Sequence, residues 1–259
     1  MSPFIECYAL GKTYASKAGP VEALRGIDLT AAAGEFVCLL GLSGCGKSTL
    51  LQIIAGLEAP TTGTVRVGGA HLDGPSDKTS VVFQDHGLFP WMNVQHNVEF
   101  NMKARHIAPA ERAERAGAML ETMRLTAFAS RYPHELSGGM RQRVGIARAL
   151  TTNPRALLMD EPFGALDAQT RSRLQEELLA IWQRQQTTVL FVTHAIEEAV
   201  VLADRVVVFS PQPGRITAIV SNPLPRPRDP ESPPFMALVK ELRRMIEGAG
   251  PDAAESSPG

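Results

Sequence analysis

Two glycine-rich segments, far apart in the chain, have the composition of anion-binding sites. Residues 41–49 read Gly-Leu-Ser-Gly-Cys-Gly-Lys-Ser-Thr and fit the pattern G-x-x-x-x-G-K-[ST]. Residues 136–143 read Leu-Ser-Gly-Gly-Met-Arg-Gln-Arg and lead into an apolar-periodic run. Glycine lets backbone N–H groups approach an anion closely, and a following helix points its positive end toward that anion. For Ser-Gly-Gly taken alone, an ordinary turn that caps a helix is the simpler interpretation.

The first segment predicts a site for the phosphates of a nucleotide. We expect Lys47 to reach the β- and γ-phosphates and the Ser48 hydroxyl to ligate Mg²⁺. The apolar run 35–40 predicts a buried strand before the loop, and residues 47–55 predict a helix after it. The residues expected to cradle the phosphates are Gly41, Ser43, Gly44, Cys45, Gly46, Lys47, Ser48 and Thr49.

A pair of carboxylates follows a second apolar run. Residues 156–159 read Ala-Leu-Leu-Met and are followed by Asp160, Glu161 and Pro162. Open α/β sheets place ligands at such strand ends. We expect Asp160 to join the Mg²⁺ shell, through water, and Glu161 to act as the general base that polarises the attacking water. A simple strand end is the alternative interpretation, and the glycine loop upstream makes it less plausible.

The hydrophobic periodicity divides the chain into a nucleotide-binding core and a helical insertion. Residues 4–86 and 154–221 predict the α/β core, with an antiparallel β edge, and residues 87–153 predict a helical subdomain that carries Ser137. The insertion includes an apolar stripe of Ala113, Ala116, Leu120 and Met123. Residues 222–247 predict a proline-rich linker and an amphipathic helix packed on its own domain, and we expect residues 248–259 to be disordered.

Composition narrows the functional classes. The chain has 259 residues, 44% of them hydrophobic and 20% charged, which is typical of a globular protein. A net charge of −1 argues against a nucleic-acid partner. Cys7, Cys38 and Cys45 form no spacing motif, which favours a reducing compartment. We expect no signal peptide and no membrane-spanning segment.

From about Phe4 to about Ser221, these motifs in this order resemble the nucleotide-binding subunit of an ABC transporter. The resemblance implies an ABC-type ATPase fold with ATP as the nucleotide. It also implies that Gln84 senses Mg²⁺ and the γ-phosphate, and that Asp167, in Gly-Ala-Leu-Asp, communicates across a dimer. His194 would contact the γ-phosphate and help to hold the attacking water.

Two assignments within this resemblance need comment. Tyr14 lies where the family places an aromatic residue that stacks on adenine, although a half-buried strand residue would look the same. Met140 stands where many members carry glutamine. Because the expected anion contacts come from the Ser137 hydroxyl and the backbone of Gly138 and Gly139, phosphate binding does not require the glutamine amide.

The second anion site predicts a shared active site. We expect the helical subdomain to hold Ser137 too far from Lys47 of its own chain to contact the same nucleotide. Two copies docked head to tail would place each ATP between Lys47 of one chain and Ser137 of the other. ATP binding would then close a homodimer and hydrolysis would reopen it.

The motifs most resemble the branch that imports nitrate, sulfonates and taurine. This resemblance implies integral membrane permease subunits, a periplasmic or extracellular solute-binding protein, and a peripheral position on the cytoplasmic face of the inner membrane. Phe89 and Trp91 either line a groove for a short permease helix or pack the helical subdomain. The alternative function is that of a soluble, non-transport ABC-type ATPase. However, an ABC-type ATPase of translation usually carries two cassettes, whereas this chain has one. An ABC-type ATPase of DNA repair carries a long coiled coil between the positions of Gln84 and Ser137, and this chain has no sustained heptads there.

Overall fold

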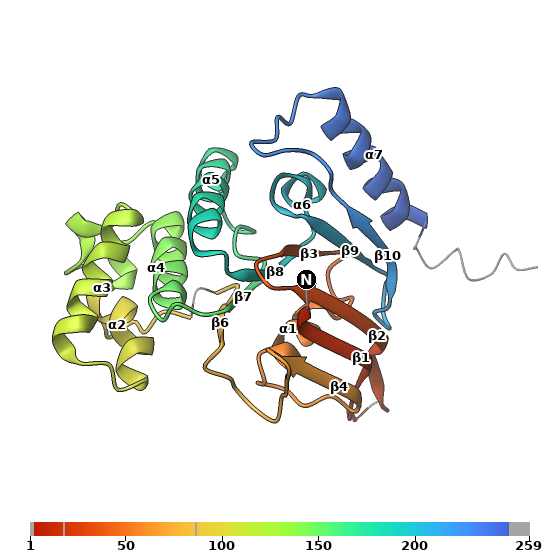
Figure 1. Cartoon of the computed structure of the whole chain (residues 1–259), viewed down its shortest axis with the longest axis horizontal. Helices are drawn as coiled ribbons and strands as arrows, with labels where there is room; N and C mark the ends of the chain where they lie inside the picture. Colours follow the sequence, from red (N-terminus) through yellow and green to blue (C-terminus); the bar gives the residue numbers. More distant parts are fainter. Residues whose placement is uncertain (1–2, 18, 86, 249–259) are drawn as a thin grey trace, which may run out of the picture. The chain divides into compact units, whose positions relative to one another are not determined.

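The computed structural model describes residues 3–17, 19–85 and 87–248, which form the mixed strands and helices traced in Figure 1. The disorder expected for residues 248–259 falls, beyond Gly248, outside the described residues. Gly248 itself closes the last helix. The described chain separates into two compact units, one made of residues 1–76 and 188–259 and the other of residues 77–187.

The first unit contains an antiparallel sheet with the strand order β2-β1-β4-β5. It also contains a parallel arrangement in which β3 lies between β8 and β9, with β10 antiparallel to β9. All five residues of β3 are apolar and buried, as expected for a parallel strand covered on both faces. The strands are β1 (Pro3–Tyr14), β2 (Val21–Ala32), β3 (Phe36–Leu40), β4 (Thr62–Val67), β5 (Ala70–His71), β8 (Thr188–Thr193), β9 (Arg205–Phe209) and β10 (Ile216–Ser221).

Three helices belong to the same unit: α1 (Lys47–Ile54), α6 (Ile196–Leu202) and α7 (Pro233–Gly248). The expected amphipathic character of α7 is confirmed, because Phe235, Leu238, Val239 and Leu242 are buried. This helix packs against α6 and β9 of its own unit (Figure 1). Four of the six prolines of residues 222–234 lie in the extended connection from β10 to α7, since proline cannot donate a ladder hydrogen bond, and Pro233 and Pro234 begin α7.

The second unit pairs the parallel strands β6 (Thr79–Val82) and β7 (Ala156–Asp160). Its helices are α2 (Val94–Ala104), α3 (Pro109–Thr122), α4 (Gly138–Leu150) and α5 (Ala168–Gln185), with short 3₁₀ turns η1 (Thr126–Phe128) and η2 (Pro133–Glu135). The expected apolar stripe of α3 is wrong at Ala113, which is exposed. Ala116, Leu120 and Met123 are buried, so α3 is covered in its C-terminal half only. The small alanine side chain loses little by facing water.

Among the described residues, no helix combines the length and the apolar character that a membrane crossing requires. The fold is α/β, and it carries the glycine-rich loop between a buried strand, β3, and a helix, α1, as expected.

A tight backbone contact supports the glycine-rich loop and gives the first testable prediction. A Cβ atom on Gly214 would lie 2.1 Å from the carbonyl oxygen of Cys45, so one backbone would have to move. We expect Gly214→Ala to lower the free energy of unfolding by about 1–3 kcal/mol, the usual cost of overpacking. Chemical denaturation measures the change.

Gly117→Ala is the matched control, because a Cβ atom there has nothing within 4 Å. That substitution lies inside α3 and should leave stability unchanged or raise it by about 0.5–1 kcal/mol. Equal stability of the Gly214 variant and the parent protein would contradict the packing account.

Candidate functional site

The glycine-rich loop ends in a helix start shaped for anion binding. Gly46 is the residue before α1 and has φ +91°, and Gly44 has φ +81°, both in the left-handed region that glycine tolerates. The first turn of α1 contains Lys47, Ser48 and Thr49 and so carries no acidic residue. The backbone N–H groups of this turn can therefore bind a phosphate without repulsion between that phosphate and a carboxylate in the same turn.

Lys47 is held against the loop that precedes it. Its side chain is only 3% exposed, and its Nζ donates to the carbonyl oxygens of Gly41 and Leu42, both at 2.8 Å. The Cys45 Sγ lies 3.4 Å from the same nitrogen. Buried charge must be satisfied by such dipoles. The Lys47 ammonium group thus lies inside the loop, where the sequence predicts that phosphate binds.

The loop packs tightly on the strands behind it. A Cβ atom on Gly46 would lie 2.6 Å from the Ala23 carbonyl oxygen, on β2. The Gly214 N–H donates to that same oxygen at 2.9 Å, and the Gly214 carbonyl accepts from the Arg25 N–H at 3.0 Å. The turn between β9 and β10 and the strand β2 therefore brace the loop from two sides. The sequence contained no local signal for this role of Gly214.

The register of β8 brings His194 to the same edge as the loop. β3 and β8 are parallel, with Leu40 opposite Thr193, so Gly41 and His194 follow immediately on neighbouring strands. Neighbouring strands lie about 4.8 Å apart. His194 is exposed. The Thr193 hydroxyl accepts a hydrogen bond from the Ala195 N–H at 3.0 Å, which shapes the turn around His194.

Tyr14 ends β1 and is half-buried. It pairs with Val21 on β2, the strand whose Ala23 touches the loop at Gly46. The Lys12 Nζ lies 4.8 Å from the centroid of the Tyr14 ring, so one face of the ring already meets a cation. The first unit therefore brings the loop and His194 to neighbouring strand ends, while Tyr14 lies in the antiparallel sheet, on the strand that pairs with β2.

In the second unit, Gln84 and Asp160 lie at one edge of the β6–β7 pair. The two strands are parallel, with Val82 opposite Met159, so Asp160 ends β7 while Gln84 follows β6 by two residues. Asp160 is half-buried and Gln84 is exposed. The strand register therefore brings these two residues to the same edge of the pair.

Glu161 has an unusual backbone conformation. Its φ is +42°, in the left-handed region that a side chain with a Cβ rarely adopts. A turn follows in which the Gly164 N–H donates to the Glu161 carbonyl at 3.2 Å. Strained residues of this kind cost about 1–3 kcal/mol and cluster at functional sites. The Glu161 side chain is half-buried in this turn.

The second anion site forms a capped helix start. Ser137 precedes α4, is exposed, and its hydroxyl accepts from the Met140 N–H at 3.3 Å. The backbone of Gly138 and Gly139 forms the first turn. The Arg141 guanidinium donates to the Leu136 carbonyl at 2.6 Å and so fixes the segment that leads into the cap. Serine at this position satisfies one of the N–H groups at the helix start.

Close contact with the first turn of α5 explains one of the two glycines. A Cβ atom on Gly139 would lie 2.7 Å from the Thr170 methyl group, so only glycine fits there without movement. Asp167 caps α5 by accepting from the Thr170 N–H at 3.0 Å. This backbone hydrogen bond is the main reason why the pKa of the exposed Asp167 carboxyl is lowered. The second unit therefore brings the Ser-Gly-Gly helix start against the Asp167 turn.

The two aromatic residues of the segment after Gln84 lie in different surroundings. Phe89 is half-buried, with its ring centroid 4.2 Å from that of Phe100, so it packs the helical region. Trp91 is 70% exposed and presents its indole to solvent.

The sequence gives no indication of the side chain that fixes the conformation of this segment, which is Asn97. Fully buried Asn97 accepts from the Phe89 N–H at 2.9 Å and donates to the carbonyls of Phe89, Met92 and Asn93. The Arg148 guanidinium, at the end of α4, donates to the Gly87 carbonyl at 2.7 Å and lies 5.5 Å from the Phe89 ring centroid. Burial lowers the pKa of Arg148.

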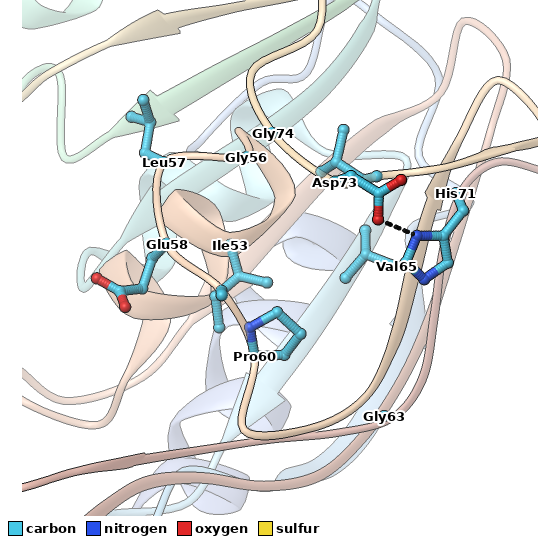
Figure 2. Close-up of a pocket in the computed structure, with 12 residues that line it drawn as sticks. Ile53, Gly56, Leu57, Glu58, Pro60, Gly63, Val65, His71, Asp73 and Gly74 are labelled. Carbon is cyan, nitrogen blue, oxygen red and sulfur yellow. Dashed lines mark hydrogen bonds and ion pairs between the residues drawn. The ribbon is translucent and has the colours of Figure 1, made fainter.

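A cavity of about 270 Å³ lies elsewhere in the first unit (Figure 2). Its lining includes Ile53, in the last turn of α1, together with Pro60 and Val65. His71 and Asp73 form a hydrogen-bonded pair of 2.9 Å at its wall. The lining shares no residue with the glycine-rich loop, which lies at the opposite end of α1.

The donor set suits Mg²⁺ held jointly with phosphate. Among the described residues, no group of three or more His, Cys, Asp or Glu side chains could hold a metal ion by itself. Mg²⁺ is usually bound through one or two carboxylates, water and substrate phosphates. Taken one by one, the Ser48 hydroxyl in the first unit and the Asp160 carboxylate and Gln84 amide oxygen in the second are oxygen ligands of the kind that Mg²⁺ prefers.

Comparison with known proteins identifies the family. The family model described as ABC transporter matches residues 24–164. The nitrate import ATP-binding protein of Synechocystis sp. is 49% identical over 97% of this chain and 98% of its own length. The aliphatic sulfonates import ATP-binding protein of Bacillus cereus is 43% identical over 93% of this chain and 95% of its own.

A solved structure supports the same assignment. A dimeric ATP-binding cassette in a post-hydrolysis state, bound to ADP and Pi, has a TM-score of 0.75 and 32% identity; the match covers 84% of this chain and 98% of that one. The expected α/β ABC ATPase fold and the family resemblance are both confirmed. The chain binds ATP, hydrolyses it, and belongs to the ABC transporter family.

Proposed function

We propose that this chain is the energy-coupling ATPase of an importer for a small anionic or zwitterionic solute of the nitrate, sulfonate or taurine type. We further propose that two copies bind and hydrolyse ATP head to tail. The observation that carries the second proposal is the presence of two separate helix starts shaped for anions, at Lys47 and at Ser137. The sulfonate and nitrate relatives support the solute class.

In this proposal the glycine-rich loop holds the β- and γ-phosphates. The N–H groups from Gly44 to Thr49 surround them, and the Lys47 ammonium exchanges its carbonyl partners for phosphate oxygens. Tyr14 stacks on the adenine. The Ser48 hydroxyl, Asp160 and Gln84 hold Mg²⁺, which neutralises charge on the phosphates when it is bound.

Hydrolysis uses one base and one positioning group. The Glu161 carboxylate accepts a proton from water, whose oxygen forms a bond to the γ-phosphorus while the bond to the bridging oxygen of ADP breaks. His194 contacts the γ-phosphate and orients the same water. The strained backbone at Glu161 suits this role, because it fixes the carboxylate before substrate arrives.

The Ser137 cap completes the site of the other copy. Its hydroxyl and the Gly138 and Gly139 N–H groups bind the γ-phosphate of the nucleotide held by the partner copy. Asp167, packed through Thr170 against Gly139, reports across the dimer whether that nucleotide is present. Since the γ-phosphate joins the two copies, its hydrolysis removes the ligand that stabilises the dimer.

The membrane partner docks on the segment that follows Gln84. Trp91 is the exposed aromatic anchor, and Asn97 and Arg148 hold the segment around it. Aromatic residues of this kind dominate the energy of many interfaces. We propose that permease subunits bind here, with the chain peripheral to the cytoplasmic face of the membrane. A solute-binding protein on the far side acts through the permease.

Replacing the general base tests the shared site. We expect Glu161→Gln to bind ATP with affinity within about twofold of the parent and to lose hydrolysis by at least about 100-fold, the usual range for a general base. The variant should form a stable dimer with ATP, because the γ-phosphate persists. Gel filtration with and without ATP measures this, and a monomer under both conditions would argue against ATP as the interface ligand.

Replacing the exposed indole tests the membrane partner. Trp91→Ala should leave ATP hydrolysis by the isolated subunit unchanged and reduce co-purification of the permease from native membranes at least about tenfold, as for a hot-spot residue. Phe128→Ala, an exposed aromatic in η1 of the same unit, is the matched control. Undiminished recovery of the permease with the Trp91 variant would place the docking surface elsewhere.

A further inference from the structure

The helix that begins two residues after His194 is short and depends on its surroundings. α6 spans only Ile196–Leu202, and isolated helices of this length are unstable in water. Its position therefore reflects the contacts it makes, and any movement of its first turn is passed to His194 through Ala195. Besides β3 and β8, these contacts come from residues 222–248, which the catalytic proposal does not use.

Side chains from the C-terminal segment cap the end of α6. Arg228 Nη1 donates to the carbonyl oxygens of Val200, Val201 and Ala203, at 2.9, 3.0 and 2.7 Å. Arg226 Nη2 donates to the Leu202 carbonyl, and Asn222 Nδ2 to the Val200 carbonyl at 2.9 Å. Every carbonyl from residue 200 to residue 203 thus accepts a hydrogen bond from this segment. These are the groups that a helix end leaves without an internal partner.

The same arginines tie α6 to the strand that leads into the glycine-rich loop. Arg226 Nη1 lies 2.5 Å from Asp204 Oδ1. The other carboxylate oxygen of Asp204 accepts from the Phe36 N–H, at the start of β3, at 2.9 Å. The connection therefore runs from the end of α6 to β3, within one compact unit.

α7 reaches the opposite end of α6. Its buried face packs on α6 and β9, and Arg243 lies 3.3 Å from Glu197 in the first turn of α6. That pair is exposed, so its energy is small. Its place, three residues after His194, shows that the C-terminal segment spans the full length of α6.

The charge of the cap is maintained at neutral pH. Burial lowers the pKa of Arg228 to about 10, which still leaves the guanidinium protonated. A cation beside the C-terminal carbonyls also complements the helix dipole.

We infer that residues 222–248 form a clamp on α6 that sets the position of His194 and thereby the rate of ATP hydrolysis. Arg226 and Arg228 are positioning residues that act through α6. The inference rests on the proposed role of His194 at the γ-phosphate. Displacement of a catalytic group by about 1 Å can lower a rate about 100-fold.

Kinetics of Arg228→Ala test the clamp. We expect kcat for ATP hydrolysis to fall about tenfold, with KM and ATP affinity within about twofold of the parent, because Arg228 contacts α6 and Leu224 and not the loop. Arg228→Lys keeps the cation and should recover part of the rate. Arg244→Ala, on an exposed position of α7, is the matched control and should match the parent.

A double variant separates positioning from general stabilisation. In a protein carrying His194→Ala, adding Arg228→Ala should cause no further loss of residual hydrolysis, because the clamp acts through the imidazole. Hydrogen exchange at the amides of residues 196–199 should be faster in Arg228→Ala than in the parent.

Two results would overturn the clamp. One is an unchanged kcat in Arg228→Ala, even with a lower melting temperature, which would leave the arginine a stabilising role only. The other is a full tenfold loss in the His194→Ala background. Parent-like hydrolysis by His194→Ala alone would instead refute the proposed role of His194, and the clamp with it.

Discussion

Parallel strand pairing is the constraint on which both units depend. It brings the carboxyl ends of neighbouring strands to one edge, where the chain must turn and where polar groups meet solvent. β3 and β8 place the glycine-rich loop beside His194 in this way. β6 and β7 do the same for Gln84 and Asp160. Fully apolar strands such as β3 secure this register, because burial fixes them on both faces.

The parts of the site that sequence alone predicted are those encoded locally. The loop at residues 41–49, the carboxylates at the end of β7 and the Ser137 cap are continuous segments whose chemistry follows from residue type and order. The supports were missed because they act across the chain. Asn97, inside α2, holds a segment that begins eight residues before it, Gly214 packs against Cys45, and Arg228 caps a helix that ends 26 residues earlier. A single polar residue or glycine carries no periodic signal.

The helix starts explain why a chain with a net charge of −1 can bind a highly charged nucleotide. Its anion sites are built from backbone N–H groups, glycine and a few placed cations, so they require no basic surface. Backbone groups also bind charge at the end of α6, where two arginines donate hydrogen bonds to backbone carbonyls.

Subunit complementation tests the central claim, that each ATP joins two copies, most directly. In the Glu161→Gln background, one variant adds Lys47→Ala and the other adds Ser137→Arg, and each alone should stay monomeric with ATP. An equal mixture should form a dimer that retains one ATP, because a single site then combines an intact Lys47 with an intact Ser137. Sedimentation with radiolabelled ATP measures both quantities. A mixture that remains monomeric and free of ATP would contradict the account.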